Sequence, residues 1–146
     1  MSLGLLIMDN MGLDSSTDAL LMYSRADLYD FTNRDDAALL TLDSLLTQFP
    51  AHSLTDEVLY RKAAIYSSKG DYVKAAELYQ EIVTTYPEDI LGDDSLFRLA
   101  ELYENKLNDK MKAQELYGSF LEKYPGSLYV IDARKRFRIL RGDTVN

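Results

Sequence analysis

Small, aromatic and proline positions return along this chain with a nearly constant spacing. Pro50 and Pro87 are 37 residues apart, and Pro125 follows after an interval that is longer by a single position. An internal repeat of this length is typical of proteins built from stacked helical or β units. The same spacing, to within one position, holds for three further columns of residues: Ala26, Ala63 and Ala100; Tyr29, Tyr66 and Tyr103; and Ala38, Ala75 and Ala113.

Each repeat unit predicts a pair of helices. In the second unit, apolar side chains recur at helical spacing in two runs, separated at Gly70, where the first helix is predicted to end. Pro87 cannot continue a helix and therefore marks the end of the unit. The alanines are predicted to lie where the two helices cross, because a one-carbon side chain lets the backbones approach closely. No stretch alternates with the period of a strand, so the predicted fold is all-α.

The closing segment predicts a capping helix. Arg138 stands where a further unit would carry its small crossing residue, so another repeat could not pack there, and terminal repeats need a polar outer face. The amino-terminal end has no matching polar cap, which suggests that native sequence preceded it. We therefore divide the chain into an extension left from a longer protein (1–15), three repeat units (16–50, 51–87 and 88–125), a capping helix (126–141) and a tail (142–146).

The second unit carries the signature of the tetratricopeptide repeat (TPR) family, which the chain resembles over about residues 16–141. The resemblance implies an α-α superhelix, a TPR solenoid of three helix-turn-helix repeats plus a carboxyl-terminal capping helix. It also implies a non-enzymatic scaffold that binds a protein or peptide in a concave groove. The eight positions that carry it are Leu59, Lys62, Ala63, Tyr66, Ala75, Tyr79, Ile82 and Pro87.

Two departures from the family pattern bear on these expectations. Arg25 and Lys62 replace the usual leucine at the second signature position, and the neighbouring apolar column Leu28, Ile65 and Leu102 is expected to carry that packing instead. The units also exceed the family's usual ~34 residues. Longer units that end in Tyr-Pro look like TPR proteins of the bacterial envelope, of the Tol-system and outer-membrane-assembly types. That likeness implies a periplasmic or envelope location, and the cytoplasm stays open.

One column suggests where a partner would bind. Tyr23, Tyr60 and Phe97 are 37 residues apart, at a position that faces the concave groove in TPR proteins. Arg61 and Arg98 follow directly, so the resemblance implies a groove of aromatic rings and guanidinium groups for a peptide partner. Alternatively, the rings pack between neighbouring helices. The function of a structural spacer or self-association module, with a homo-oligomer, also stays open.

Composition narrows the remaining chemistry. The chain lacks cysteine, which excludes disulfides and thiolate sites, and its longest apolar run is only about five residues, too short to cross a bilayer. The net charge of −8 lies within residues 1–60, and residues 61–146 hold equal numbers of acids and bases. An acidic end repels nucleic acid and favours basic partners. We interpret the five bases from Arg134 to Arg141 as the solvated side of the cap rather than a nucleic-acid site.

No catalytic, cofactor or metal site is predicted. The single histidine, His52, lies in a loop without a nucleophile arrangement around it, and a lone loop histidine is usually a surface residue. Paired acids at Asp35–Asp36, Glu88–Asp89 and Asp93–Asp94 fall at or before helix starts, where carboxylates suit the helix dipole.

Overall fold

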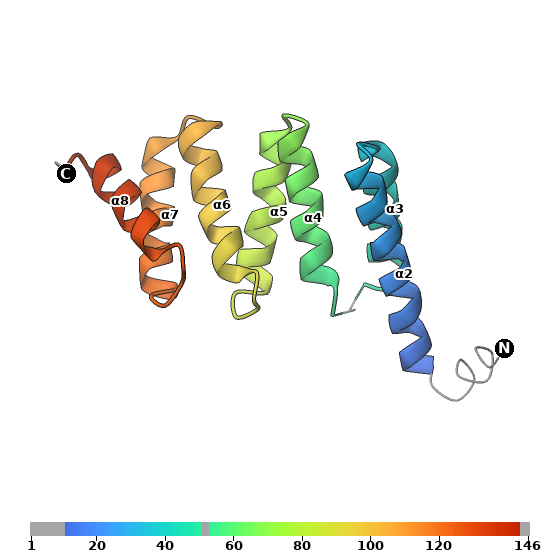
Figure 1. The fold of residues 1–146 in the computed structure, drawn as a ribbon. Coiled ribbons are helices and arrows are strands. Elements are labelled where there is room, and N and C mark those ends of the chain that lie inside the picture. The colour runs from blue at the N-terminus through green and yellow to red at the C-terminus, as the bar shows by residue number, and fades with distance from the viewer. Residues whose placement is uncertain (1–10, 51–52, 144–146) are drawn as a thin grey trace. The chain divides into compact units, whose positions relative to one another are not determined.

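The computed structural model describes residues 11–50 and 53–143, with side chains from residue 17 onward, and in these ranges it holds seven α-helices and no strand (Figure 1). The predicted all-α repeat fold is confirmed. The chain divides into two compact units, Met1–Val58 and Leu59–Asn146, and each is described by itself.

The first compact unit is built on a helical hairpin. Helix α2 (Met11–Phe31) packs against α3 (Asp35–Gln48), and the first residues of α4 (Thr55–Ser68) also belong to this unit. Helix α2 begins inside the segment assigned above to an extension. Leu28, expected to pack like Ile65 and Leu102, is instead 60% exposed. That expectation was wrong because α2 has no preceding helix to cover it within the described residues.

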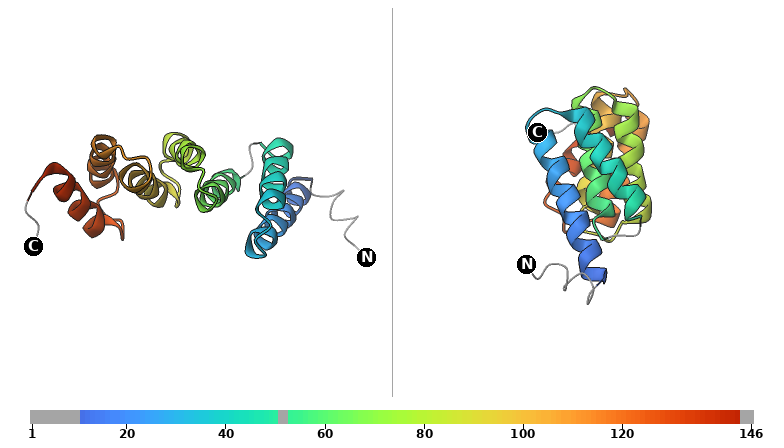
Figure 2. Two further views of the ribbon diagram at one scale, coloured as in Figure 1. Left: turned by 90° about the horizontal axis from the view of Figure 1, so that it is seen from above. Right: turned by 90° about the vertical axis from the view of Figure 1, so that its right-hand side faces the viewer.

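The second compact unit holds the rest of α4 and four further helices. These are α5 (Tyr72–Thr85), α6 (Gly92–Asn105), α7 (Lys110–Lys123) and α8 (Val130–Arg141). From α5 onward each helix packs against the next along the chain. Seen from above, α4, α6 and α8 form one row of this unit, and α5 and α7 form the other (Figure 2).

The crossing alanines are fully buried. All six, together with Ala133 of α8, have no exposed surface, as the repeat pattern predicts. Leucines and aromatic rings make up much of the remaining buried core, and burying one such side chain contributes about 1.5–3 kcal/mol. Close approach of paired helices at small residues is therefore the shared packing rule of the repeat units. The six alanines are Ala26, Ala38, Ala63, Ala75, Ala100 and Ala113.

The turn inside each unit uses one left-handed residue. Asn33, Gly70 and Asn108 have φ angles of 60°, 87° and 55°, and they recur at the same intervals as the three prolines. Glycine and asparagine adopt this conformation more readily than other residues. The third unit, which has no glycine in its turn, therefore keeps the same geometry through Asn108. After the turn, Asp71 and Asp109 cap α5 and α7 by accepting backbone N–H bonds.

The units end in one conformation as well. Phe49, Tyr86 and Tyr124, each followed by proline, have φ between −132° and −128° and donate their N–H to the carbonyl four residues earlier. A residue before proline is driven out of the helical region, which explains why the helices stop here.

Helix α8 closes the second compact unit. Its Phe137 ring lies against Gly118 of α7, where an added Cβ would come within 3.0 Å of the ring. The bases Arg134 and Arg138 of this helix are exposed. Packing on α7 and a charged outer surface are the properties expected of a cap.

Candidate functional site

A polar network lies along the α4–α6–α8 row of the second compact unit, and Asp94 is its centre. The hydroxyl of Tyr60 donates a 2.6 Å hydrogen bond to Asp94 Oδ1, and the hydroxyl of Tyr129 donates a 2.8 Å bond to Oδ2. Tyr60 lies in α4 and Tyr129 just precedes α8. One carboxylate in α6 therefore holds side chains from both neighbouring repeats.

Arg98 joins the same network one helical turn later. Its Nε lies 3.3 Å from Asp94 Oδ1, and its Nη1 donates a 2.7 Å bond to Glu101. Its Nη2 also lies 3.5 Å from the Tyr129 hydroxyl oxygen. The side chain is 39% exposed, so this guanidinium is positioned by its neighbours and still reaches the surface.

Aromatic rings form the floor beneath this network. Phe97 stacks on Tyr129 with ring centroids 4.7 Å apart and meets Tyr117 and Phe120 edge-on. Tyr60 meets Tyr79 in a T-shaped contact at 5.5 Å. Such pairs add about 0.5–1.5 kcal/mol beyond their buried area, so the positions of the polar groups above them are well fixed.

Two hollows flank Arg98. One, of about 230 Å³, is lined by residues of α4, α5 and α6 that include Ser67 and Tyr79. The other, of about 590 Å³, lies towards α8 and is lined by residues that include Tyr117, Lys135 and Arg136. Arg98 and Glu101 line both hollows, so they stand between two places where a partner's side chains could insert.

The electrostatics of the site fix its protonation. Burial and the hydrogen bond to Asp94 raise the pKa of Tyr60, and burial raises the pKa of Tyr79 to about 12. Burial works against the charge of Arg98, but the hydrogen bond and charge of Glu101, with further help from Tyr60 and Asp94, raise the pKa of the guanidinium. Near neutral pH the site therefore presents neutral phenols and a fixed positive charge.

A second polar cluster joins α6, α7 and α8. Glu104 is only 2% exposed, and its Oε1 accepts hydrogen bonds from the Tyr117 hydroxyl (2.9 Å) and from Arg136 Nε (3.1 Å). Arg136 Nη2 bonds the other carboxylate oxygen. A buried carboxylate needs such partners, because an unpaired charge in the interior is very costly.

The residues predicted to line a groove have different positions. Tyr60 and Arg98 are partly exposed and meet through Asp94. Arg61 follows Tyr60 in α4 and is partly exposed, whereas Phe97 is 5% exposed and belongs to the floor. Tyr23 is partly exposed on α2 and lies in the other compact unit.

Several residues of the site escaped the sequence analysis. Asp94 was interpreted only as an acid suited to a helix start; it does lie in the first turn of α6, but it also accepts from two tyrosines. The repeat pattern did not single out Glu104, because Ser67 stands at the same position one unit earlier. Arg136 follows Arg61 and Arg98 at the same intervals as the three prolines, so the repeat could have identified it.

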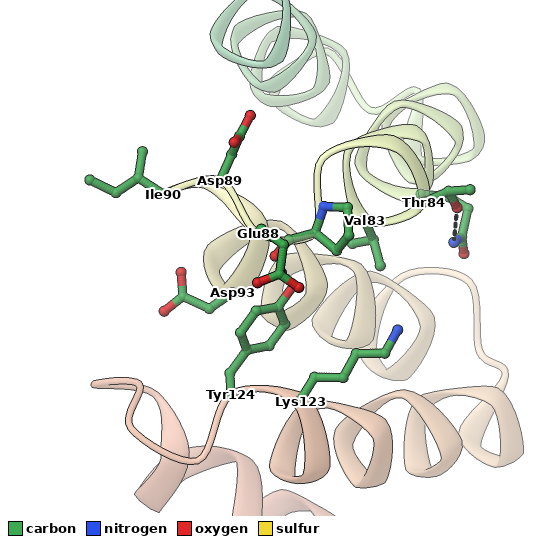
Figure 3. Close-up of a pocket in the computed structure, with 10 residues that line it drawn as sticks. Val83, Thr84, Glu88, Asp89, Ile90, Asp93, Lys123 and Tyr124 are labelled. Atoms are coloured by element: carbon green, nitrogen blue, oxygen red, sulfur yellow. Dashed lines mark hydrogen bonds between the residues drawn. The ribbon is translucent and has the colours of Figure 1, made fainter.

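A further hollow, of about 920 Å³, lies at the loop end of the second compact unit (Figure 3). Tyr124 points into it, and its hydroxyl donates a 2.8 Å bond to the carbonyl oxygen of Pro87. A Cβ on Gly92 would lie 2.5 Å from that oxygen and 2.8 Å from the hydroxyl, so glycine leaves room for this contact. We interpret this region as a joint between repeats.

Two further kinds of site are relevant to the described residues, a metal-binding group and a membrane-spanning helix. Among them, no three His, Asp or Glu side chains are grouped so that they could hold a metal ion. No helix in the described ranges is both long enough and apolar enough to span a bilayer. His52 lies outside the described residues.

Helical hairpins that recur at a nearly constant interval, with alanines at each crossing, define a helical-repeat protein. A sequence model of the tetratricopeptide repeat family matches residues 57–89 and 94–127, which cover most of the second and third units. The match supports a tetratricopeptide-repeat protein, and repeats of this family generally serve as protein-interaction modules. No curated protein matches the chain.

Proposed function

We propose that this protein is a non-enzymatic scaffold that binds a protein or peptide partner along the α4–α6–α8 row. The observation that carries the proposal is Arg98, which three neighbours position between two hollows while it remains partly exposed. A charged group that is already ordered loses little entropy on binding, and arginine is enriched among the residues that dominate interfaces.

The chemistry of the site favours binding over catalysis. A general acid or base works best when its pKa lies near the working pH. The tyrosines here have raised pKa values and the pKa of Arg98 is raised as well, so these groups change protonation far from neutrality. They act as hydrogen-bond donors and as a fixed charge.

Charge reversal at Lys135 tests the proposal. Lys135 is exposed and lines the larger hollow, whereas its neighbour Arg134 is exposed on the same helix and does not line it. In cross-linking of the intact protein in its own cells, we expect Lys135→Glu to reduce the partner's yield at least tenfold. Arg134→Glu, with the same charge change, should leave the yield unchanged. Equal losses, or no loss, would overturn the proposal, provided circular dichroism shows both variants folded.

A structural spacer or self-association module is the second candidate function. Exposed apolar side chains on α2 favour it, since Leu21 is 60% exposed and Phe31 is 84% exposed. If the protein self-associates through α2, Phe31→Ser should shift it from oligomer to monomer in analytical ultracentrifugation. A wild-type protein that sediments as a monomer at all concentrations would exclude it.

For location, we infer the bacterial periplasm or envelope. The support is the resemblance of the long, Tyr-Pro-ended units to envelope proteins. Fractionation of the source cells, with detection of the intact parent protein, tests it, and recovery in the cytoplasmic fraction would refute it.

A further inference from the structure

A buried carboxylate, that of Glu104, lies at the centre of the junction between α6, α7 and α8. A carboxylate from α6 is buried between the hydroxyl of Tyr117 in α7 and the guanidinium of Arg136 in α8. Both partners direct hydrogen-bond donors at the carboxylate, and charge-assisted bonds of this kind are roughly twice as strong as neutral ones. This junction is therefore a carboxylate-binding site, and the carboxylate that occupies it is the chain's own Glu104.

The same three positions recur one unit earlier with a single change. Tyr79 and Arg98 precede Tyr117 and Arg136 by one full repeat, so the phenol and the guanidinium are both kept. Ser67 precedes Glu104 by one repeat as well, and here the carboxylate is missing. The hollow of about 230 Å³ lies at this junction and is lined by Ser67, Tyr79 and Arg98.

The donors around this hollow have unused capacity. Tyr79 is 5% exposed, and its hydroxyl makes no hydrogen bond within the part of the chain that the structure describes. Arg98 has five N–H groups, and three of them face Asp94, Glu101 and Tyr129. Tyr60 is a further hydrogen-bond neighbour of the guanidinium, so only the remaining N–H capacity is open to a ligand.

The other side chains that line the hollow also favour a ligand that accepts hydrogen bonds. Ser67, Asn105 and Lys106 can all donate hydrogen bonds, and Glu101 is the one acidic residue among the lining residues. Arg98 and Lys106 together balance the charges of Asp94 and Glu101. An incoming group that only accepts hydrogen bonds and carries a negative charge would therefore meet donors on most sides.

We propose that this hollow binds an acidic side chain, Glu or Asp, of a partner polypeptide, in the place that the Glu104 carboxylate fills one unit later. The inference rests on the proposed scaffold function and names the chemistry of its partner. The partner's carboxylate accepts from the Tyr79 hydroxyl and from the remaining N–H capacity of Arg98. Its presence would complete the same arrangement of phenol, guanidinium and carboxylate at both junctions.

The first experiment supplies the carboxylate from the chain itself. In Ser67→Glu the new side chain should reach the hollow, and we expect a higher midpoint of urea unfolding than in the uncharged isostere Ser67→Gln. The difference should disappear when Arg98 is also changed to Met. A Glu variant no more stable than the Gln variant would overturn the inference, because the donors would then not accept a carboxylate.

The second experiment uses an array of short synthetic peptides, acetylated and amidated at their ends, with the full-length protein as probe. We expect the bound peptides to share a Glu or Asp whose change to Gln or Asn weakens binding at least tenfold. Ser67→Glu should weaken binding to the same extent, and Ser67→Gln should not.

The outcomes separate the two proposals. Peptides that bind without a shared acidic residue, or that bind Ser67→Glu as well as wild type, overturn the inference and leave the scaffold function standing. Binding restored only by peptides with a free carboxyl terminus also overturns it, because the ligand would be a chain end. If no peptide binds the wild-type protein, the scaffold function fails on the array and the inference fails with it.

Discussion

The hydroxyl of Tyr124 donates a 2.8 Å hydrogen bond to the carbonyl oxygen of Pro87, which is the proline that ends the preceding repeat. The tyrosine of one Tyr-Pro pair thus holds the proline of the pair before it, 37 residues away in sequence. The Tyr-Pro motif that follows the second helix of each unit, α5 or α7, therefore also joins the second unit to the third.

This joint gives the first prediction. Tyr124→Phe removes one hydrogen bond and keeps the ring, so we expect the free energy of unfolding to fall by about 1 kcal/mol. Gly92→Ala should cost more, about 1–3 kcal/mol, because the new Cβ meets the Pro87 oxygen. Both are measured by urea denaturation. Gly126→Ala is the matched control, since a Cβ there has nothing within 4 Å. A Gly92→Ala variant as stable as this control would show that the joint is not tightly packed.

The left-handed turn residues give the second prediction. A Cβ at Gly70 meets no atom within 4 Å, so any cost of Gly70→Ala comes from its φ of +87°. We expect a loss of about 1–2 kcal/mol in the free energy of unfolding. Asn108→Gly should be neutral or slightly stabilising, whereas Asn108→Ala should be destabilising, as in the other turn. Equal stability of the Ala and Gly variants at position 108 would contradict this account.

The repeat and its packing could be predicted because they depend on residue type at fixed spacing. A fully buried alanine leaves the same mark in every unit, and so does a proline that cannot continue a helix. The column of turn residues was recognised only at Gly70, because asparagine takes the place of glycine in the other two turns and adopts a similar positive φ. Spacing alone would have found the column if both residue types had been accepted.

The candidate site was harder to predict, because a recurring residue type does not report which side chains contact one another across helices. Tyr129 has no counterpart of the same type in the other units, since Leu54 and Leu91 precede it at repeat spacing. The direction of Phe97 depends on the rings of Tyr117, Phe120 and Tyr129 around it, and no spacing within one helix reports that. Arg98 was predicted to line a groove, but nothing in the sequence indicated its contact with Asp94, since only the fold brings Tyr60 and Tyr129 to that carboxylate.

The third prediction concerns alkaline pH. Burial raises the pKa of Tyr79 to about 12 from the ordinary value of 10.0. Between these values the folded protein keeps a proton that the unfolded chain has lost, so stability falls as the pH rises from about 10 to 12. Tyr79→Phe removes this group, and we expect a shallower fall in the urea midpoint across that range. Phenolate absorbance measures the titration of the tyrosines directly. Identical pH profiles for the two proteins would mean that Tyr79 titrates normally.

The fourth prediction concerns the buried carboxylate under the cap. Arg136→Met leaves Glu104 with the Tyr117 hydroxyl as its remaining side-chain donor, and a buried charge that loses its partner is strongly destabilising. Because Arg136 is 37% exposed, water can replace part of the lost interaction, and we expect a cost of about 2 kcal/mol in the free energy of unfolding. The loss should appear first as faster amide hydrogen exchange in α8.

Removing the charge should then recover stability. In the double variant Glu104→Gln with Arg136→Met, the amide still accepts from Tyr117 and no buried charge remains, so we expect most of the loss to be regained. Arg134→Met, at an exposed position of the same helix, is the matched control and should change stability by less than about 0.5 kcal/mol. If Arg136→Met behaves like this control, the guanidinium contributes nothing to the cap, and packing of Phe137 against Gly118 must hold α8 in place.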